Sequence, residues 1–74
     1  MTHITVGFGS PPDREKLVAM LSTENEQFAE INQESETLLV VELYPRRDGQ
    51  PWVVEFEEFL VALQNAKRRL VGTD

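Results

Sequence analysis

The last third of the chain places a proline-flanked turn directly before an amphipathic helix. The segment Tyr44–Trp52 holds two prolines around an Asp-Gly pair, a composition typical of a turn that ends a strand. After it, apolar residues recur at the three-and-four spacing of one helical face. They are Phe56, Phe59, Leu60, Leu63, Ala66 and Leu70. We therefore expect a closing helix from about Glu55 to Val71, with Gly72 as its C-cap.

The N-terminal residues 2–8 alternate apolar and polar side chains, which is the period of a half-buried strand. After this strand, Ser10 suits a helix N-cap, and Pro11 and Pro12 suit a first helical turn, where a missing N–H costs nothing. We therefore expect a first helix from about Pro11 to Leu21. Its buried stripe would be Leu17, Val18 and Leu21.

The middle of the chain is compatible with two structures. Phe28 and Ile31 are three residues apart and could extend the first helix. The same stretch also alternates, and Thr37–Tyr44, rich in Leu and Val, needs a neighbouring strand. We favour a hairpin of Gln27–Asn32 with Thr37–Tyr44, connected by residues 33–36, and keep the long helix as the alternative.

The predicted strand Thr37–Tyr44 has two apolar faces. One face, which we expect to lie in the core, carries Leu39, Val41 and Leu43. The other carries Leu38, Val40 and Tyr44. If this second face is exposed, it marks a protein interface, most simply that of a homodimer. The alternative is that the ends of the chain or its loop cover it.

A short returning strand at Trp52–Val54 completes the predicted elements. The order β-α-β-β-β-α predicts a single α+β domain over residues 1–74. We expect a small, mainly antiparallel sheet of three to four strands with two helices on one face, because each helix has only one apolar stripe. A chain of 74 residues has a thin core, so oligomerisation is a natural expectation.

Composition excludes several classes of function. Thirteen acidic and seven basic side chains give a net charge of −6, which repels phosphate backbones and favours a basic protein partner over nucleic acid. The chain lacks cysteine and has one histidine, His3, so we expect no metal site and no cofactor. No apolar run approaches the roughly 18 residues that span a bilayer. We expect no membrane association and a cytoplasmic location.

The chemistry-bearing residues form no catalytic motif. The serines lack the context of a nucleophile elbow, and the glutamates lie in polar stretches where solvation is the expected state. The densest mixture of aromatic and charged side chains is Tyr44, Arg46, Arg47, Asp48 and Trp52. We predict that this set binds a protein partner. In the purely structural alternative, it is a solvated hairpin end whose Trp52 seals the core.

These observations predict a small, acidic, non-enzymatic protein-interaction or regulatory module. In size, acidity and lack of catalytic residues the chain is similar to bacterial immunity and inhibitor proteins that bind basic toxins or nucleases, a similarity of composition alone. One alternative is a small enzyme or enzyme subunit with a carboxylate site at a dimer interface. Another is a nucleic-acid accessory factor, provided that two basic groups lie on one side of the domain. These groups are Arg46 with Arg47, and Lys67 with Arg68 and Arg69.

Overall fold

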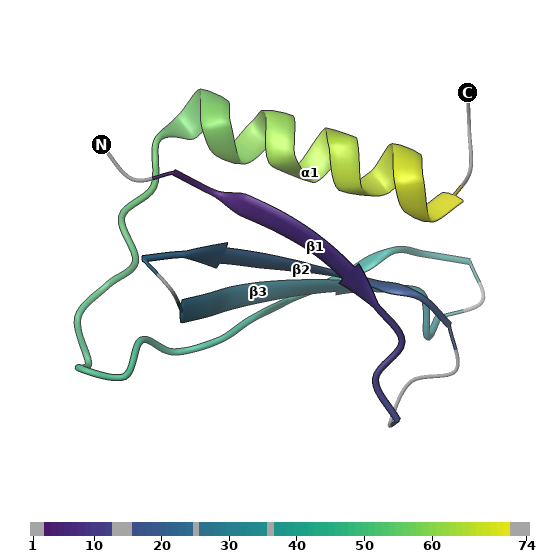
Figure 1. Cartoon of the computed structure of the whole chain (residues 1–74), viewed down its shortest axis with the longest axis horizontal. Coiled ribbons are helices and arrows are strands. Elements are labelled where there is room, and N and C mark those ends of the chain that lie inside the picture. Colours follow the sequence, from purple (N-terminus) through teal and green to yellow (C-terminus); the bar gives the residue numbers. More distant parts are fainter. Residues whose placement is uncertain (1–2, 13–15, 25, 36, 72–74) are drawn as a thin grey trace.

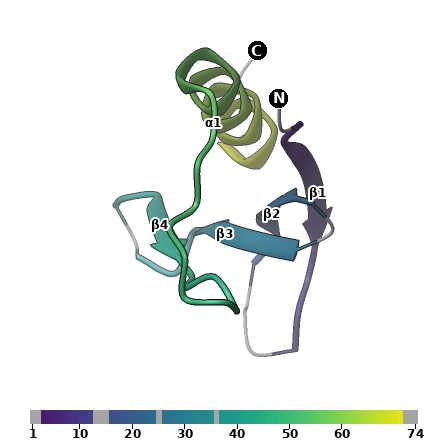
Figure 2. The same cartoon turned by 90° about the vertical axis from the view of Figure 1, so that its left-hand side faces the viewer.

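The computed structural model describes residues 3–12, 16–24, 26–35 and 37–71, which form four strands and one helix. They are β1 (Thr5–Gly9), β2 (Val18–Thr23), β3 (Glu26–Asn32), β4 (Val40–Leu43) and α1 (Phe56–Val71). The strands make one antiparallel sheet in chain order, and α1 lies against one face of it (Figure 1, Figure 2). The prediction of an α+β fold with a small antiparallel sheet is confirmed.

The predicted first helix, Pro11–Leu21, is wrong for the residues that the structure describes. β2 lies inside the sheet, antiparallel to β1 on one side and to β3 on the other. The start at Ser10 and the prolines satisfied the local rules for a helix, but pairing with two neighbouring strands outweighs local propensity. Residues 13–15 of the predicted helix lie outside the described residues. The order is therefore β-β-β-β-α, with one helix in the described part and not two.

The hairpin predicted in the middle of the chain is confirmed. β3 pairs antiparallel with β4, and Ile31 lies opposite Val41 in the register. The alternative of a long helix through this stretch is therefore wrong. The predicted closing helix is also confirmed, as α1, while Gly72, its predicted C-cap, lies outside the described residues.

The strand predicted at Trp52–Val54 is wrong, because this segment is an extended connection that pairs with no described strand. Its side chains hold it in place: Trp52 and Val54 pack against the core, and Trp52 Nε1 donates a hydrogen bond of 3.1 Å to the backbone oxygen of Tyr44. The turn before it is formed as expected. Gly49 has a φ of 77°, a left-handed conformation that glycine adopts without strain.

A β-bulge shapes the core. The pairing of β2 with β3 shifts between Leu21, which lies opposite Ala29, and Ser22, which lies opposite Gln27, so Phe28 is an extra residue in β3. The bulge brings Phe28 into the same buried cluster as Ala29. The rest of that cluster comes from the sheet and from one stripe of α1, and its members are Ala19, Leu21, Ile31, Ala62, Ala66 and Leu70.

The position of α1 decides which side chains of β4 are buried. Val41 and Leu43 lie opposite Ile31 and Ala29, and therefore share the helix-facing side of the sheet. However, α1 packs on β1 and β2, so Val41 stays 44% exposed and Leu43 69% exposed. The prediction that both lie in the core is wrong, whereas Leu39 does pack against the core.

For the opposite face of β4 the sequence left an exposed and a covered apolar face as alternatives. Leu38 is exposed, but Val40 and Tyr44 are half-buried. Tyr44 Oη donates a hydrogen bond of 3.2 Å to Glu30 Oε1 on the neighbouring strand. A polar cluster therefore occupies part of this face.

Candidate functional site

The predicted partner-binding segment, Tyr44–Trp52, folds back on itself around one aromatic ring. Trp52 lies between the core and the loop: its ring centroid is 5.6 Å from that of Phe28, and its Nε1 bonds to Tyr44 O. The guanidinium of Arg46 lies over the Trp52 ring, 5.2 Å from the ring centroid, in the geometry of a cation–π contact. Tyr44, Arg46 and Trp52 are thus brought together.

Arg46 makes one ion pair within this segment and one to the turn between β2 and β3. Its Nε lies 3.1 Å from Asp48 Oδ1, and its Nη2 lies 3.6 Å from Glu24 Oε1. Arg47 donates its backbone N–H to Glu26 Oε2 of β3 at 3.3 Å, and its Nε lies 3.9 Å from the same oxygen, while its side chain is 89% exposed. Of the five predicted residues, Arg47 is therefore the one whose side chain extends furthest into solvent.

The two basic groups of the nucleic-acid alternative lie far apart. The loop around Arg46 and Arg47 is at the lower left of Figure 1, and the end of α1 that carries Lys67, Arg68 and Arg69 is at the right. The structure places the two groups at opposite ends of the long axis and not on one side. The two basic groups therefore form no single continuous basic surface.

A polar cluster lies on the sheet face opposite α1, and the sequence did not indicate it. Glu30 and Glu42 are register partners, and Asn32 Nδ2 donates to both carboxylates, at 3.3 Å and 3.0 Å. Tyr44 Oη donates to Glu30 as well. Like charges opposite each other in a sheet are destabilising unless such donors hold them. The sequence feature that could have pointed to this cluster is the alternation of the polar residues Glu30 and Asn32 with Ala29 and Ile31, which places both polar side chains on one face of the strand.

The described residues contain no group of three or more His, Asp and Glu side chains placed to hold a metal ion. The Glu30–Glu42 pair with Asn32 and Tyr44 can accept and donate hydrogen bonds, but its own members already make several of these bonds to one another. The cluster therefore works first as a way to keep two carboxylates inside the sheet.

Exposed apolar side chains lie on α1 and on β4. Phe56 and Leu60 are on the flank of α1 that faces away from β1, because the opposite flank, with Val61 and Asn65, lines a hollow beside β1. On β4, Val41 and Leu43 share the helix-facing side of the sheet. All four side chains are exposed, Phe56 at 71%. We call Val41, Leu43, Phe56 and Leu60 the α1–β4 apolar surface.

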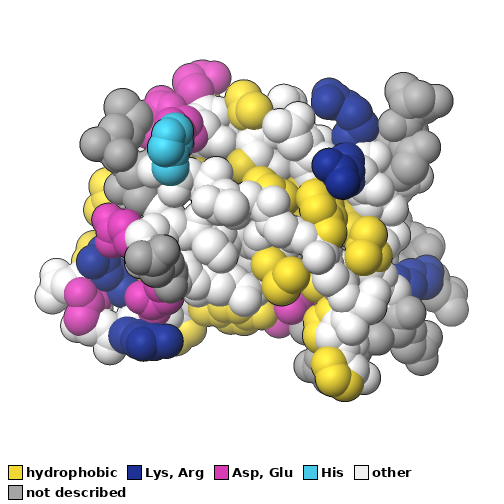
Figure 3. All heavy atoms as spheres, viewed as in Figure 1, with side chains coloured by type: hydrophobic (Ala, Val, Ile, Leu, Met, Phe, Trp, Pro, Cys, Tyr) yellow, Lys and Arg dark blue, Asp and Glu magenta, His cyan; other side chains and the backbone are white. Residues whose placement is uncertain are grey.

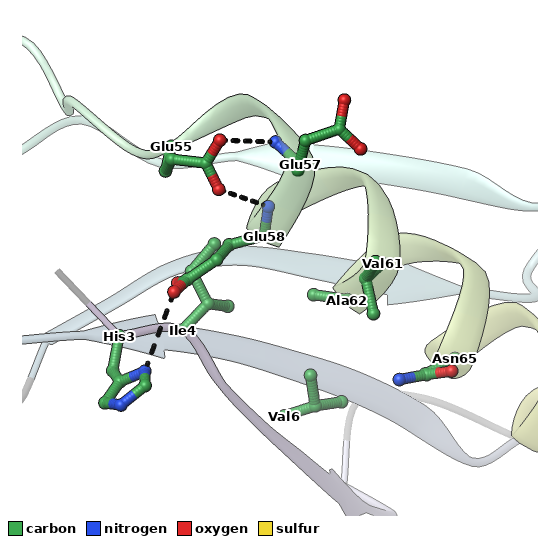
Figure 4. Close-up of a pocket in the computed structure, with 9 residues that line it drawn as sticks. All are labelled: His3, Ile4, Val6, Glu55, Glu57, Glu58, Val61, Ala62 and Asn65. Atoms are coloured by element: carbon green, nitrogen blue, oxygen red, sulfur yellow. Dashed lines mark hydrogen bonds and ion pairs between the residues drawn. The ribbon is translucent and has the colours of Figure 1, made fainter. Parts of the chain in front are cut away.

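A groove runs along the other side of the helix, between α1 and β1, and Figure 4 shows its part at the start of α1. It consists of two hollows of about 410 Å³ and about 330 Å³ that share Val6 and Asn65 as lining residues. Apolar side chains of β1, among them Val6 and Phe8, form its floor, and Val61 of α1 lines its wall. We call it the β1–α1 groove.

The two ends of the β1–α1 groove carry opposite charge. At the start of α1, Glu55 accepts hydrogen bonds from the backbone N–H groups of Glu57 and Glu58, and Glu58 Oε2 lies 3.8 Å from His3 Nδ1 (Figure 4). At the other end, the hollow is lined by Arg68 and Arg69. From the sequence, Arg68 and Arg69 were considered only as part of a basic group for nucleic-acid binding.

No protein-family model, curated protein or solved structure matches this chain. Among the described residues, no helix is long and apolar enough to cross a bilayer. The function of the chain is therefore inferred from its own surfaces.

Proposed function

We propose that this protein is a small non-enzymatic interaction module that binds a protein partner through the α1–β4 apolar surface. The observation that carries the proposal is the exposure of four large apolar side chains, two on the flank of α1 away from β1 and two on the helix-facing side of β4, with Leu43 at 69% and Phe56 at 71%. Single exposed apolar side chains are normal, but a group of them on one face is typical of a binding site.

The Tyr44–Trp52 segment forms the polar rim of this surface in the proposed complex. The segment begins directly after Leu43 and ends directly before Val53, which is itself exposed. Trp52 connects rim and core through its contact with Phe28. An apolar centre with a polar rim is the usual composition of an interface, and aromatic and arginine residues are enriched in interfaces. In this proposal Arg47, with its exposed side chain, makes a direct contact with the partner.

The partner in this proposal is a basic protein. The chain has a net charge of −6, and the first turn of α1, beside Phe56, carries Glu57 and Glu58. Charge of this sign speeds the encounter with a basic partner, while the apolar centre holds the complex together. The mode of binding is that of an acidic inhibitor or immunity protein, in which a small domain covers part of a basic target.

The test is quantitative capture from native lysate with three tagged proteins: the natural chain, Leu43→Glu/Phe56→Glu, and the control Gln64→Glu/Thr37→Glu. Both variants add the same negative charge, and the control changes exposed polar positions outside the surface. We expect a basic protein to be retained by the natural chain and the control and lost from the first variant. Equal retention by all three proteins would contradict the proposal.

One observation favours a second candidate, an enzyme or enzyme subunit that uses carboxylates. Glu30 and Glu42 lie opposite each other on the sheet face away from α1, and Asn32 and Tyr44 donate to them. Titration with Mn²⁺ alone distinguishes a reactive pair from a structural one. Selective broadening of the NMR signals of Glu30 and Glu42 at equimolar Mn²⁺ would favour the second candidate, and unchanged signals would argue for a structural role.

A further inference from the structure

We propose that the β1–α1 groove binds a second copy of this chain. In the dimer, β1 of one copy pairs antiparallel with β1 of the other about a two-fold axis beside Gly7, so that one sheet continues across both chains. The interface uses the flank of α1 opposite to the α1–β4 apolar surface. The proposed dimer goes beyond the proposed function, and either proposal, the dimer or the partner binding, can fail without the other.

The first argument is the free edge of β1. β1 is a terminal strand of the sheet, and its outer edge pairs with no described strand. Proteins protect such edges with charged residues, prolines or bulges, because the free backbone groups are a template for another strand. Thr5–Gly9 has no charged residue and no proline, and its pairing with β2 runs without a register shift. The other terminal strand, β4, carries Glu42 among its four residues.

The second argument is the order of charge along the groove. One end carries Glu57 and Glu58 beside His3, and the other end carries Arg68 and Arg69 (Figure 3). A two-fold axis reverses the direction of the second copy, so the acidic end of each chain meets the basic end of the other. One dimer then contains two such contacts. Complementarity of this kind selects the antiparallel register over a parallel one.

The third argument is that the spacing of the charges slightly exceeds the length of the strand. Glu57 and Arg68 are eleven positions apart on α1, or about 16 Å at the rise of a helix. From Thr5 to Gly9, β1 spans about 13 Å at the rise of a strand. Val6 and Asn65 line both hollows, so they lie between the two charged ends of the groove, and Gly7, the central residue of β1, is next to Val6. A two-fold axis beside Gly7 therefore pairs the two strands about their centre and leaves the charged ends of the groove on either side of it.

The wall of the groove supplies apolar surface in the hollow at its acidic end. Val61 is 50% exposed there, on the flank of α1 beside β1. An added Cβ at Gly7 would meet no atom within 4 Å, so β1 is also open on the sheet face away from the groove. A two-fold axis beside Gly7 places the Gly7 of a second copy next to this one. The free edge, the ordered charge and the apolar wall thus fit a second copy of this chain.

Charge reversal tests the proposal by analytical ultracentrifugation, which separates the 8.5 kDa monomer from a dimer of twice that mass. Arg68→Glu/Arg69→Glu lowers the net charge from −6 to −10. Its matched control, Arg47→Glu/Lys67→Glu, gives the same net charge from exposed positions outside the groove. We expect the first variant to raise the dissociation constant of the dimer at least about tenfold more than the control does, because close charge pairs become repulsive.

The opposite reversal gives a sharper comparison. Glu57→Lys/Glu58→Lys reduces the net charge from −6 to −2, so long-range repulsion between copies falls. The proposal nevertheless expects a weaker dimer, because two cationic ends then meet. An equimolar mixture of this variant with Arg68→Glu/Arg69→Glu restores opposite charges at both contacts of a mixed dimer. We expect the mixture to dimerise about as tightly as the natural chain.

Far-UV circular dichroism verifies that each variant is folded, and NMR of the unmodified chain supplies a test without substitutions. In a mixed sample of labelled and unlabelled chains, the proposal expects NOEs between the Hα protons of Gly7 in the two copies. A natural chain that stays monomeric at millimolar concentration would overturn the proposal. So would a dimer that shows no contact at Gly7, or one whose dissociation constant changes equally in the Arg68→Glu/Arg69→Glu variant and its control.

Discussion

Phe28 packs its ring against Trp52, with the centroids 5.6 Å apart and the planes tilted by 43°. Phe28 is the extra residue of the bulge in β3, and its ring also lies 5.9 Å from that of Phe59 on α1. The three rings therefore join the sheet, the loop after β4 and the helix. The bulge, a local irregularity of one strand, sets the position of the loop that borders the proposed partner-binding surface.

Removing the indole tests this contact. We expect Trp52→Ala to lower the free energy of unfolding by about 3 kcal/mol, because a half-buried aromatic ring is lost from the core. Trp52→Phe keeps a ring but loses the bond from Nε1 to Tyr44 O, and we expect a loss of about 1 kcal/mol. Both variants lack the single tryptophan of the chain, so urea unfolding is followed by circular dichroism and not by tryptophan fluorescence. Val53→Ala, at the exposed neighbouring position, is the control. Equal losses at positions 52 and 53 would contradict the assignment.

The start of α1 depends on Glu55. Its two carboxylate oxygens accept from the backbone N–H groups of Glu57 and Glu58, at 3.0 Å and 2.9 Å. These N–H groups have no partner inside the helix, so we expect Glu55→Ala to cost about 1 kcal/mol of stability in thermal or urea unfolding. Glu57→Ala removes the same charge without removing the cap. If both substitutions have the same effect, only the charge at the helix terminus matters.

The polar cluster predicts a large loss of stability when the side-chain amide of Asn32 is removed. Asn32 is buried and donates to Glu30 and Glu42, so Asn32→Ala removes a donor that the two carboxylates share. We expect a loss of about 2 kcal/mol in the free energy of unfolding at neutral pH. Asn65→Ala, at an exposed position of α1, serves as the control and should change stability by less than about 0.5 kcal/mol. A loss at Asn32 as small as that of the control would show that the amide is not needed in the cluster.

Because α1 lies over β1 and β2, we expect two leucines of the sheet to contribute very differently to stability. Leu21 is fully buried, and we expect Leu21→Ala to cost about 3 kcal/mol. Leu43 is 69% exposed, and we expect Leu43→Ser to stay within about 0.5 kcal/mol of the natural chain. Equilibrium unfolding of both variants measures the difference. A large loss at Leu43 would mean that this side chain is covered in solution, for example by a partner or by a second copy.

Local signals in the sequence were sufficient for part of the fold. The apolar spacing from Phe56 to Leu70 predicted α1, and the Asp48-Gly49 pair predicted the turn before it, because both depend on residues close in the chain. The β3–β4 hairpin was also predicted, since its strands are separated by a short connection. The five residues of the predicted binding site were recognised as a group, and Tyr44, Arg46, Asp48 and Trp52 do lie together through direct contacts.

The sequence by itself thus determined the closing helix, the turn and the hairpin, where the deciding interactions lie within a few residues of each other. The tertiary structure alone decided that Val18–Thr23 is a strand, because its partners are distant and pairing on both sides outweighs a favourable helix start. It also decided where α1 lies across the sheet. That position leaves Val41 and Leu43 open and forms the β1–α1 groove, since one apolar stripe covers only part of a four-stranded sheet.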